Sequence, residues 1–130
     1  MSTISRDYTD NLDCAVPATT RIGISDQIVE NPGFVMGNFS IPPKGRTRRH
    51  FNVNADLAMY KVRGQGRLLV GPDHQLEEMD FSAEDFAYVH KGEIYCFENV
   101  GDESDFVIFT YIGVSNIEEA QEVYIEPPVA

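Results

Sequence analysis

The chain has 130 residues, of which 42% are hydrophobic and 24% charged, and this composition is typical of one folded domain with its own core. Acidic residues outnumber basic ones by 21 to 10, and the formal charge of -11 argues against nucleic acid and anionic membranes as partners. No apolar run reaches the roughly 20 residues of a membrane span, and the first residues lack a signal-peptide core, so we expect a cytoplasmic protein.

Short runs of β-branched and aromatic residues, separated by clusters of Gly, Pro, Asn and Asp, extend along the chain from Ile22 onward. This spacing is typical of an all-β sandwich or barrel. We therefore predict an N-terminal arm over residues 1–21 and one β-barrel domain over residues 22–130. The predicted strands cover residues 34–41, 48–53, 58–63, 67–70, 75–81, 86–89, 94–98 and 106–112.

The end of the sequence predicts a short helix followed by a last strand. Residues 115–118 read Ser-Asn-Ile-Glu, a capping-box pattern in which the Ser hydroxyl and the Glu carboxylate bind free amides at a helix start. The helix is expected to end near Gln121. A strand over residues 123–126 should follow and stop at Pro127 and Pro128, which cannot donate a backbone hydrogen bond.

Two stretches resemble the paired motifs of the cupin superfamily. The first extends from Gly45 to Gly64 and contains His50-Phe51-Asn52 where the family has His-x-His. The second begins with His90-Lys91-Gly92 and ends at Asn99, where the family has a Pro-x-Gly turn and a later Asn. The resemblance covers about residues 34–113, and it implies a single-domain cupin-type β-barrel, the double-stranded β-helix or jelly roll, with the short C-terminal helix added to it.

In the cupin family, two His and one Glu of the first motif and one His of the second hold an iron, manganese, nickel or zinc ion. Only His50 is retained here, because Asn52 and Tyr95 occupy two of the positions and the Glu position falls beside Asp56. We therefore predict no firmly bound metal. The alternative is one divalent ion (Fe, Mn, Ni or Zn) held by His50, Asp56 and Tyr95, with His90 as a further candidate ligand.

Strand alternation places Arg48, His50 and Asn52 on one face, and an inward Tyr95 takes Phe97 with it. We predict that His50 and Tyr95 are catalytic. A histidine with an ordinary pKa of about 6.5 moves protons at neutral pH, and a tyrosine hydroxyl can stabilise an oxyanion. The predicted substrate-binding residues are Arg48, Asn52, Met59, His90 and Phe97.

Lys44, Arg46, Arg48 and Arg49 form a basic cluster in an acidic chain. A guanidinium group suits a substrate carboxylate, and salt bridges to the many Asp and Glu residues are the other interpretation. Arg48 is the preferred carboxylate ligand because it shares a strand face with His50.

These residues favour a small-molecule enzyme that uses acid-base chemistry in an internal barrel pocket, as a lyase, dehydratase, isomerase or cyclase. One alternative is a metal-dependent cupin, such as a dioxygenase or a metal-assisted isomerase. A second is a non-catalytic module that binds a small ligand. The expected partner is a small molecule, with carboxylates as a candidate class, and the resemblance also implies a homodimer in which residues 22–29 are a candidate exchanged strand.

Overall fold

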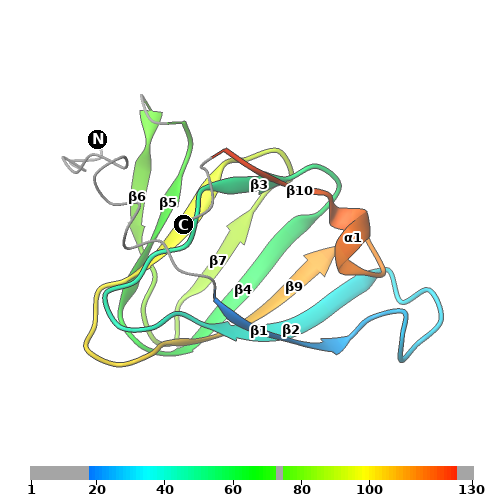
Figure 1. The fold of residues 1–130 in the computed structure, drawn as a ribbon, viewed down its shortest axis with the longest axis horizontal. Helices are drawn as coiled ribbons and strands as arrows, with labels where there is room; N and C mark the ends of the chain where they lie inside the picture. The colour runs from blue at the N-terminus through cyan, green and yellow to red at the C-terminus, as the bar shows by residue number, and fades with distance from the viewer. Residues whose placement is uncertain (1–17, 73–74, 126–130) are drawn as a thin grey trace.

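The computed structural model describes residues 18–72 and 75–125, and Figure 1 shows how their strands are arranged. The elements are β1 (Thr19–Ile24), β2 (Phe34–Ser40), β3 (His50–Asn52), β4 (Asp56–Arg63), β5 (Gly66–Val70), β6 (Glu77–Asp80), β7 (Phe86–Val89), β8 (Tyr95–Asn99), β9 (Phe106–Ile112), α1 (Ile117–Ala120) and β10 (Glu122–Tyr124). No helix within these ranges is long and apolar enough to cross a membrane.

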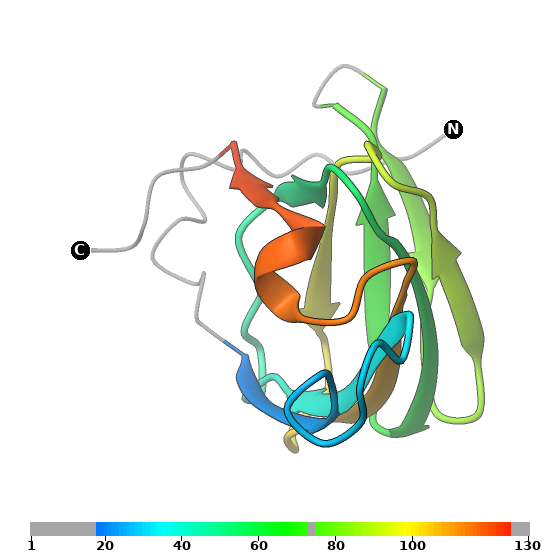
Figure 2. The same cartoon turned by 90° about the vertical axis from the view of Figure 1, so that its right-hand side faces the viewer.

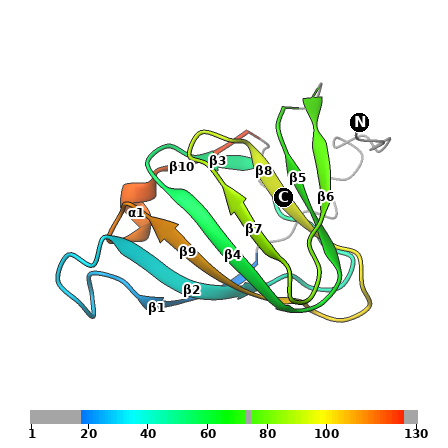
Figure 3. The same ribbon diagram turned by 180° about the vertical axis from the view of Figure 1, so that it is seen from behind.

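Two antiparallel five-stranded sheets face each other and enclose the core (Figure 3). One sheet has the strand order β1-β2-β9-β4-β7, and the other has the order β10-β3-β8-β5-β6. Buried residues alternate with more exposed ones along β2, β4 and β9, as expected for strands with one face toward a core. The prediction of an all-β barrel with a short C-terminal helix is therefore confirmed.

All eight strands predicted between residues 34 and 112 are present, with bounds that differ by at most a few residues. Strand β1 was missed as part of the barrel, because most of its side chains are exposed and no buried face marks it in the sequence. It pairs with β2 of the same chain and ends at Ile24, so a strand continuing to Val29 is wrong. Most of the predicted 1–21 arm lies outside the described residues, and the arm stays a prediction. The homodimer and the strand exchange within it also stay predictions.

The helix forms where the sequence predicts it, but its cap is one residue further on. The Asn116 side chain accepts a hydrogen bond from the Glu119 amide at 2.9 Å, and the Glu119 carboxylate accepts one from the Ser115 amide at 2.8 Å. Asn is as good an N-cap as Ser, so the cap shifts by one position, and the Glu119 carboxylate binds the amide of the residue before the cap. Gln121 then adopts a left-handed conformation with φ 54°, which ends α1 and turns the chain into β10.

A buried ion pair closes the core near the β4–β5 connection. The Lys61 ammonium lies 3.3 Å from an oxygen of Asp105, and each side chain is 1% exposed. The other oxygen of Asp105 accepts a hydrogen bond from the Ile41 amide at 2.7 Å. Gly66 leaves room for this arrangement, since a Cβ there would lie 2.7 Å from the Lys61 nitrogen. The pair therefore joins β4 to the segments that follow β2 and precede β9.

Candidate functional site

Three residues form a row across neighbouring strands of the second sheet. The strand register pairs His50 on β3 with Tyr95 on β8 and with Tyr124 on β10. Directly paired residues on adjacent strands point to the same face of a sheet. The rings are correspondingly close, with centroid distances of 4.4 Å between His50 and Tyr95 and 5.0 Å between His50 and Tyr124.

The row runs from the barrel interior to the surface. Tyr95 is 1% exposed, His50 is 7% exposed and Tyr124 is 43% exposed. Figure 2 shows α1 (orange) and β10 (red), the strand that carries Tyr124, at the same end of the barrel. The arrangement therefore has a buried floor at Tyr95 and an exposed edge at Tyr124.

The His50 ring is fixed by its backbone contact in an orientation that suits a base. Its Nδ1 lies 2.9 Å from the Arg48 carbonyl oxygen, which can only accept, so Nδ1 carries the proton. Burial lowers the pKa of His50 below its ordinary value, against the opposing effects of that carbonyl and of the Glu122 carboxylate. The neutral ring therefore predominates at pH 7 and presents Nε2 as a proton acceptor.

Tyr95 and Asn52 form the buried floor. The Asn52 Nδ2 donates a hydrogen bond to the Tyr95 hydroxyl at 3.0 Å. Burial raises the pKa of Tyr95 well above 10, so its hydroxyl keeps its proton and acts as a hydrogen-bond donor. The Asn52 Oδ1 is buried and has no hydrogen-bond partner among the residues the structure describes.

Three residues of this cluster were not predicted from the sequence: Tyr111, Glu122 and Tyr124. The Tyr111 and Tyr124 hydroxyls donate to the two oxygens of Glu122, at 3.3 and 2.8 Å. Burial is the largest cause that raises the pKa of Tyr111, and it also raises the pKa of Tyr124 to about 12. Tyr111 shares strand parity with the buried Phe109, which was the available signal in the sequence.

Arg48 lies at the exposed edge of the row. Its guanidinium carbon is 3.9 Å from the centre of the Tyr124 ring, a cation–π contact. The same charge contributes to the lowered pKa of His50. Arg48 therefore brings a positive charge next to the base, although it precedes β3 and does not share a strand face with His50.

Met59 and Phe97 belong to the hydrophobic core beneath this row. They are 4% and 5% exposed, and the Phe97 ring lies 5.5 Å from the Tyr95 ring and 5.1 Å from the Phe39 ring. Aromatic packing accounts for these contacts. A direct contact of Met59 or Phe97 with a ligand stays a prediction.

Asp56 and His90 lie on the outer side of the barrel, away from the core. Leu57 takes the inward position on β4, and the Asp56 carboxylate faces out, where it accepts hydrogen bonds from the Tyr88 hydroxyl and from the Lys91 amide. These hydrogen bonds, that of Tyr88 first, lower the pKa of Asp56. His90 is exposed, with its ring 5.0 Å from the Tyr88 ring. The structure therefore does not bring Asp56 or His90 to the inner row.

The donors on the inner face do not fit the metal site of the cupin motifs. Within residues 18–72 and 75–125, no three His, Cys, Asp or Glu side chains come close enough to share a metal ion. The inner cluster offers one imidazole and one carboxylate, from His50 and Glu122. Its remaining polar groups include the Asn52 amide and the Tyr95 phenol, whereas the cupin motifs supply His and Glu at these positions. The alternative set of His50, Asp56 and Tyr95 is not assembled, because Asp56 faces outward.

No protein-family model matches the chain, and a search of curated proteins found no relative. Solved structures of oxalate decarboxylases do match. The formate complex of the Lactobacillus farciminis enzyme has a TM-score of 0.70 and 15% identity, over 83% of this chain and 31% of that one. A Bacillus subtilis structure studied for its Mn(II) centres has a TM-score of 0.72 and 18% identity, over 85% of this chain and 29% of that one.

A second Bacillus subtilis structure, studied for its substrate binding mode and reaction specificity, matches with the same TM-score of 0.72 and 18% identity. The chain spans about 30% of the length of the oxalate decarboxylases that it matches, as the shares of 31%, 29% and 29% state. Likeness at this level of identity concerns the fold. The paired motifs thus predicted the architecture correctly, and the chain has the cupin fold found in the domains of oxalate decarboxylase.

Proposed function

We propose that the chain is a small-molecule enzyme of the cupin type that moves a proton with His50 and needs no tightly bound metal. The proposed reaction removes a proton from a carbon next to a carboxylate or carbonyl group. Lyases, dehydratases, isomerases and cyclases use this step. The proposed substrate class is small hydroxy acids.

The observation that carries the proposal is the buried Oδ1 of Asn52. A buried acceptor without a partner costs about 1–3 kcal/mol, and native proteins contain few of them. A ligand hydroxyl that donates to this oxygen would remove the cost. Because His50 lies on the same strand face as Asn52, and Tyr95 binds the same amide group, such a ligand would lie beside both groups.

Each residue has one role in the proposed reaction. His50 Nε2 accepts the proton from carbon, because its Nδ1 is occupied by the Arg48 carbonyl. Tyr95, whose hydroxyl donates to Tyr111 in the free protein, turns its proton to the substrate oxygen on which negative charge develops. The Arg48 guanidinium, stacked on Tyr124, pairs with the carboxylate at the exposed edge. A carboxylate substrate also agrees with the names of the matched oxalate decarboxylases.

The first test is exchange of carbon-bound hydrogen in D₂O. The protein is incubated with a panel of small hydroxy and keto acids, including oxalate as a substrate without carbon-bound hydrogen, and loss of C–H signals is followed by NMR. We expect exchange or turnover of at least one hydroxy acid, and the same rate after removal of metals with a chelator. Loss of all activity on chelation would favour the metal-dependent alternative, and tight binding without exchange would favour a binding module.

The exchange rate should depend on pH in the direction set by His50. Burial lowers the pKa of His50, so the neutral base forms below the ordinary value of 6.5. We therefore expect kcat/KM to rise with pH, with a midpoint below 6.5, and to reach a plateau above it. Tyr95 adds no decline near neutrality, because its pKa lies well above 10. A rate profile between about pH 5 and pH 9 tests this, and a rate that falls as the pH rises would contradict it.

A further inference from the structure

Glu122 contacts functional groups from three strands at the edge of the inner row. Its Oε2 lies 3.7 Å from His50 Nε2 on β3 and 3.3 Å from the Tyr111 hydroxyl on β9. Its Oε1 accepts a hydrogen bond from the Tyr124 hydroxyl on β10 at 2.8 Å. The two phenols therefore hold the carboxylate with one oxygen directed at the base.

The same carboxylate is connected to the floor of the site. Tyr95 and Tyr111 share a hydrogen bond, and Tyr111 donates in turn to Glu122 Oε2. The hydrogen bonds that lead from Tyr95 through Tyr111 and the contact from His50 therefore meet at the same atom, Glu122 Oε2. Glu122 is placed there by strand pairing, since it lies opposite Asn52 in the β10–β3 register.

Groups from every neighbouring element face His50. Tyr95 approaches from β8 and Tyr124 from β10, while Arg48 lies two residues before His50, ahead of β3. The charged groups that act on the ring are Glu122, which favours the protonated form, and Arg48, which disfavours it. The carboxylate is thus the charged group that, together with the Arg48 carbonyl, opposes the effects of burial and of the Arg48 charge on the His50 pKa.

We propose that Glu122 is a positioning residue that holds His50 and neutralises the imidazolium formed when Nε2 takes the substrate proton. In this step the C–H bond breaks, the Nε2–H bond forms and the electron pair stays on the substrate. The proton later leaves Nε2 for solvent, which reaches this edge because the Glu122 side chain is 32% exposed. The inference rests on the proposed function for its catalytic meaning, and the His50–Glu122 coupling can be measured without a substrate.

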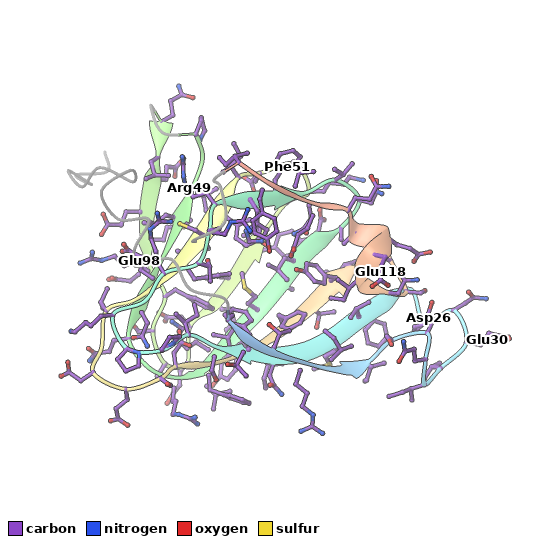
Figure 4. All side chains as sticks on the ribbon, viewed as in Figure 1. Asp26, Glu30, Arg49, Phe51, Glu98 and Glu118 are labelled. Carbon is purple, nitrogen blue, oxygen red and sulfur yellow. The ribbon has the colours of Figure 1, made fainter. Side chains whose placement is uncertain are left out.

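The test is an NMR titration of the His50 ring protons in wild type, Glu122→Gln and Glu118→Gln. Glu118 is a matched control, since it is an exposed acid on α1 (Figure 4). Glu122→Gln should lower the His50 pKa by roughly 0.7 unit or more, as expected for unit charges about 4 Å apart even in water-like surroundings. Glu118→Gln should move it far less, and Glu122→Asp, which keeps the charge, should restore part of the shift.

An unchanged His50 pKa in Glu122→Gln, or an equal shift in Glu118→Gln, would overturn the inference. If Glu122→Gln disturbs β10, Tyr124→Phe serves as the second variant. It removes one hydrogen bond to the Glu122 carboxylate without changing the charge of that group. The His50 pKa should therefore shift by less than it does in Glu122→Gln. Once a substrate is found, Glu122→Gln should lower kcat more than it changes KM, because its effect arises in the transition state. A shifted His50 pKa in a protein that exchanges no panel compound would support the coupling and contradict the proposed function.

Discussion

Replacing His50 with glutamine is expected to lower the exchange rate by about 10²- to 10⁴-fold, the usual loss when an acid-base group is removed. Glutamine has a similar size and can still donate to the Arg48 carbonyl, but it has no nitrogen that accepts a proton at neutral pH. The residual rate should also lose its dependence on pH below 6.5. Exchange in D₂O across the same acid panel measures both effects.

His90→Gln is the matched control for this variant. His90 is exposed and lies against Tyr88 on the outer side of the wall, so its replacement should leave the exchange rate within about twofold of wild type. Thermal unfolding of both variants shows that each one folds. An unchanged rate in His50→Gln, or an equal loss in His90→Gln, would contradict the assignment of the base.

The second large effect is expected at the Lys61–Asp105 pair. Asp105→Asn should destabilise the protein by about 3–5 kcal/mol, because it leaves a buried ammonium without its counter-charge. The asparagine oxygen can still accept the hydrogen bond from the Ile41 amide. The loss of stability therefore measures mainly the effect of the missing charge. Denaturant unfolding at neutral pH measures the change in the free energy of unfolding.

The double variant Lys61→Met/Asp105→Asn provides the control. With both charges gone, most of the lost stability should return, since a buried pair can often be replaced by an apolar side chain at little cost. Burial already lowers the pKa of Lys61, and without the carboxylate the single variant should gain stability as pH rises and the amine loses its proton. A loss below about 1 kcal/mol in the single variant, or no recovery in the double one, would show that the pair contributes little.

Strand alternation was sufficient to predict the inner face of β3. His50 and Asn52 are buried while Phe51 is half-buried, as a period of two requires. The same rule explains why Asp56 cannot replace the missing glutamate ligand, because Leu57 holds the inward position on β4. Local pattern is reliable at β3 and β4 because each of these strands has one face against the core.

The pairing of strands that are distant in the sequence could not be predicted from the local pattern. Glu122 lies in a short strand with exposed side chains, and nothing in its neighbours indicates that β10 pairs with β3. Tyr111 was predicted to be in a strand, but its distance from Glu122 depends on how the two sheets meet. The polar half of the cluster could therefore be found only once the long-range register was known.

The row formed by His50, Tyr95 and Tyr124 also has an evolutionary consequence. Each ring stands on a different strand and contacts its neighbour, so a change of size at one position alters the space available at the next. We therefore expect selection to act jointly on positions 50, 95 and 124. Among homologous sequences these three columns should covary, even where the intervening residues diverge freely.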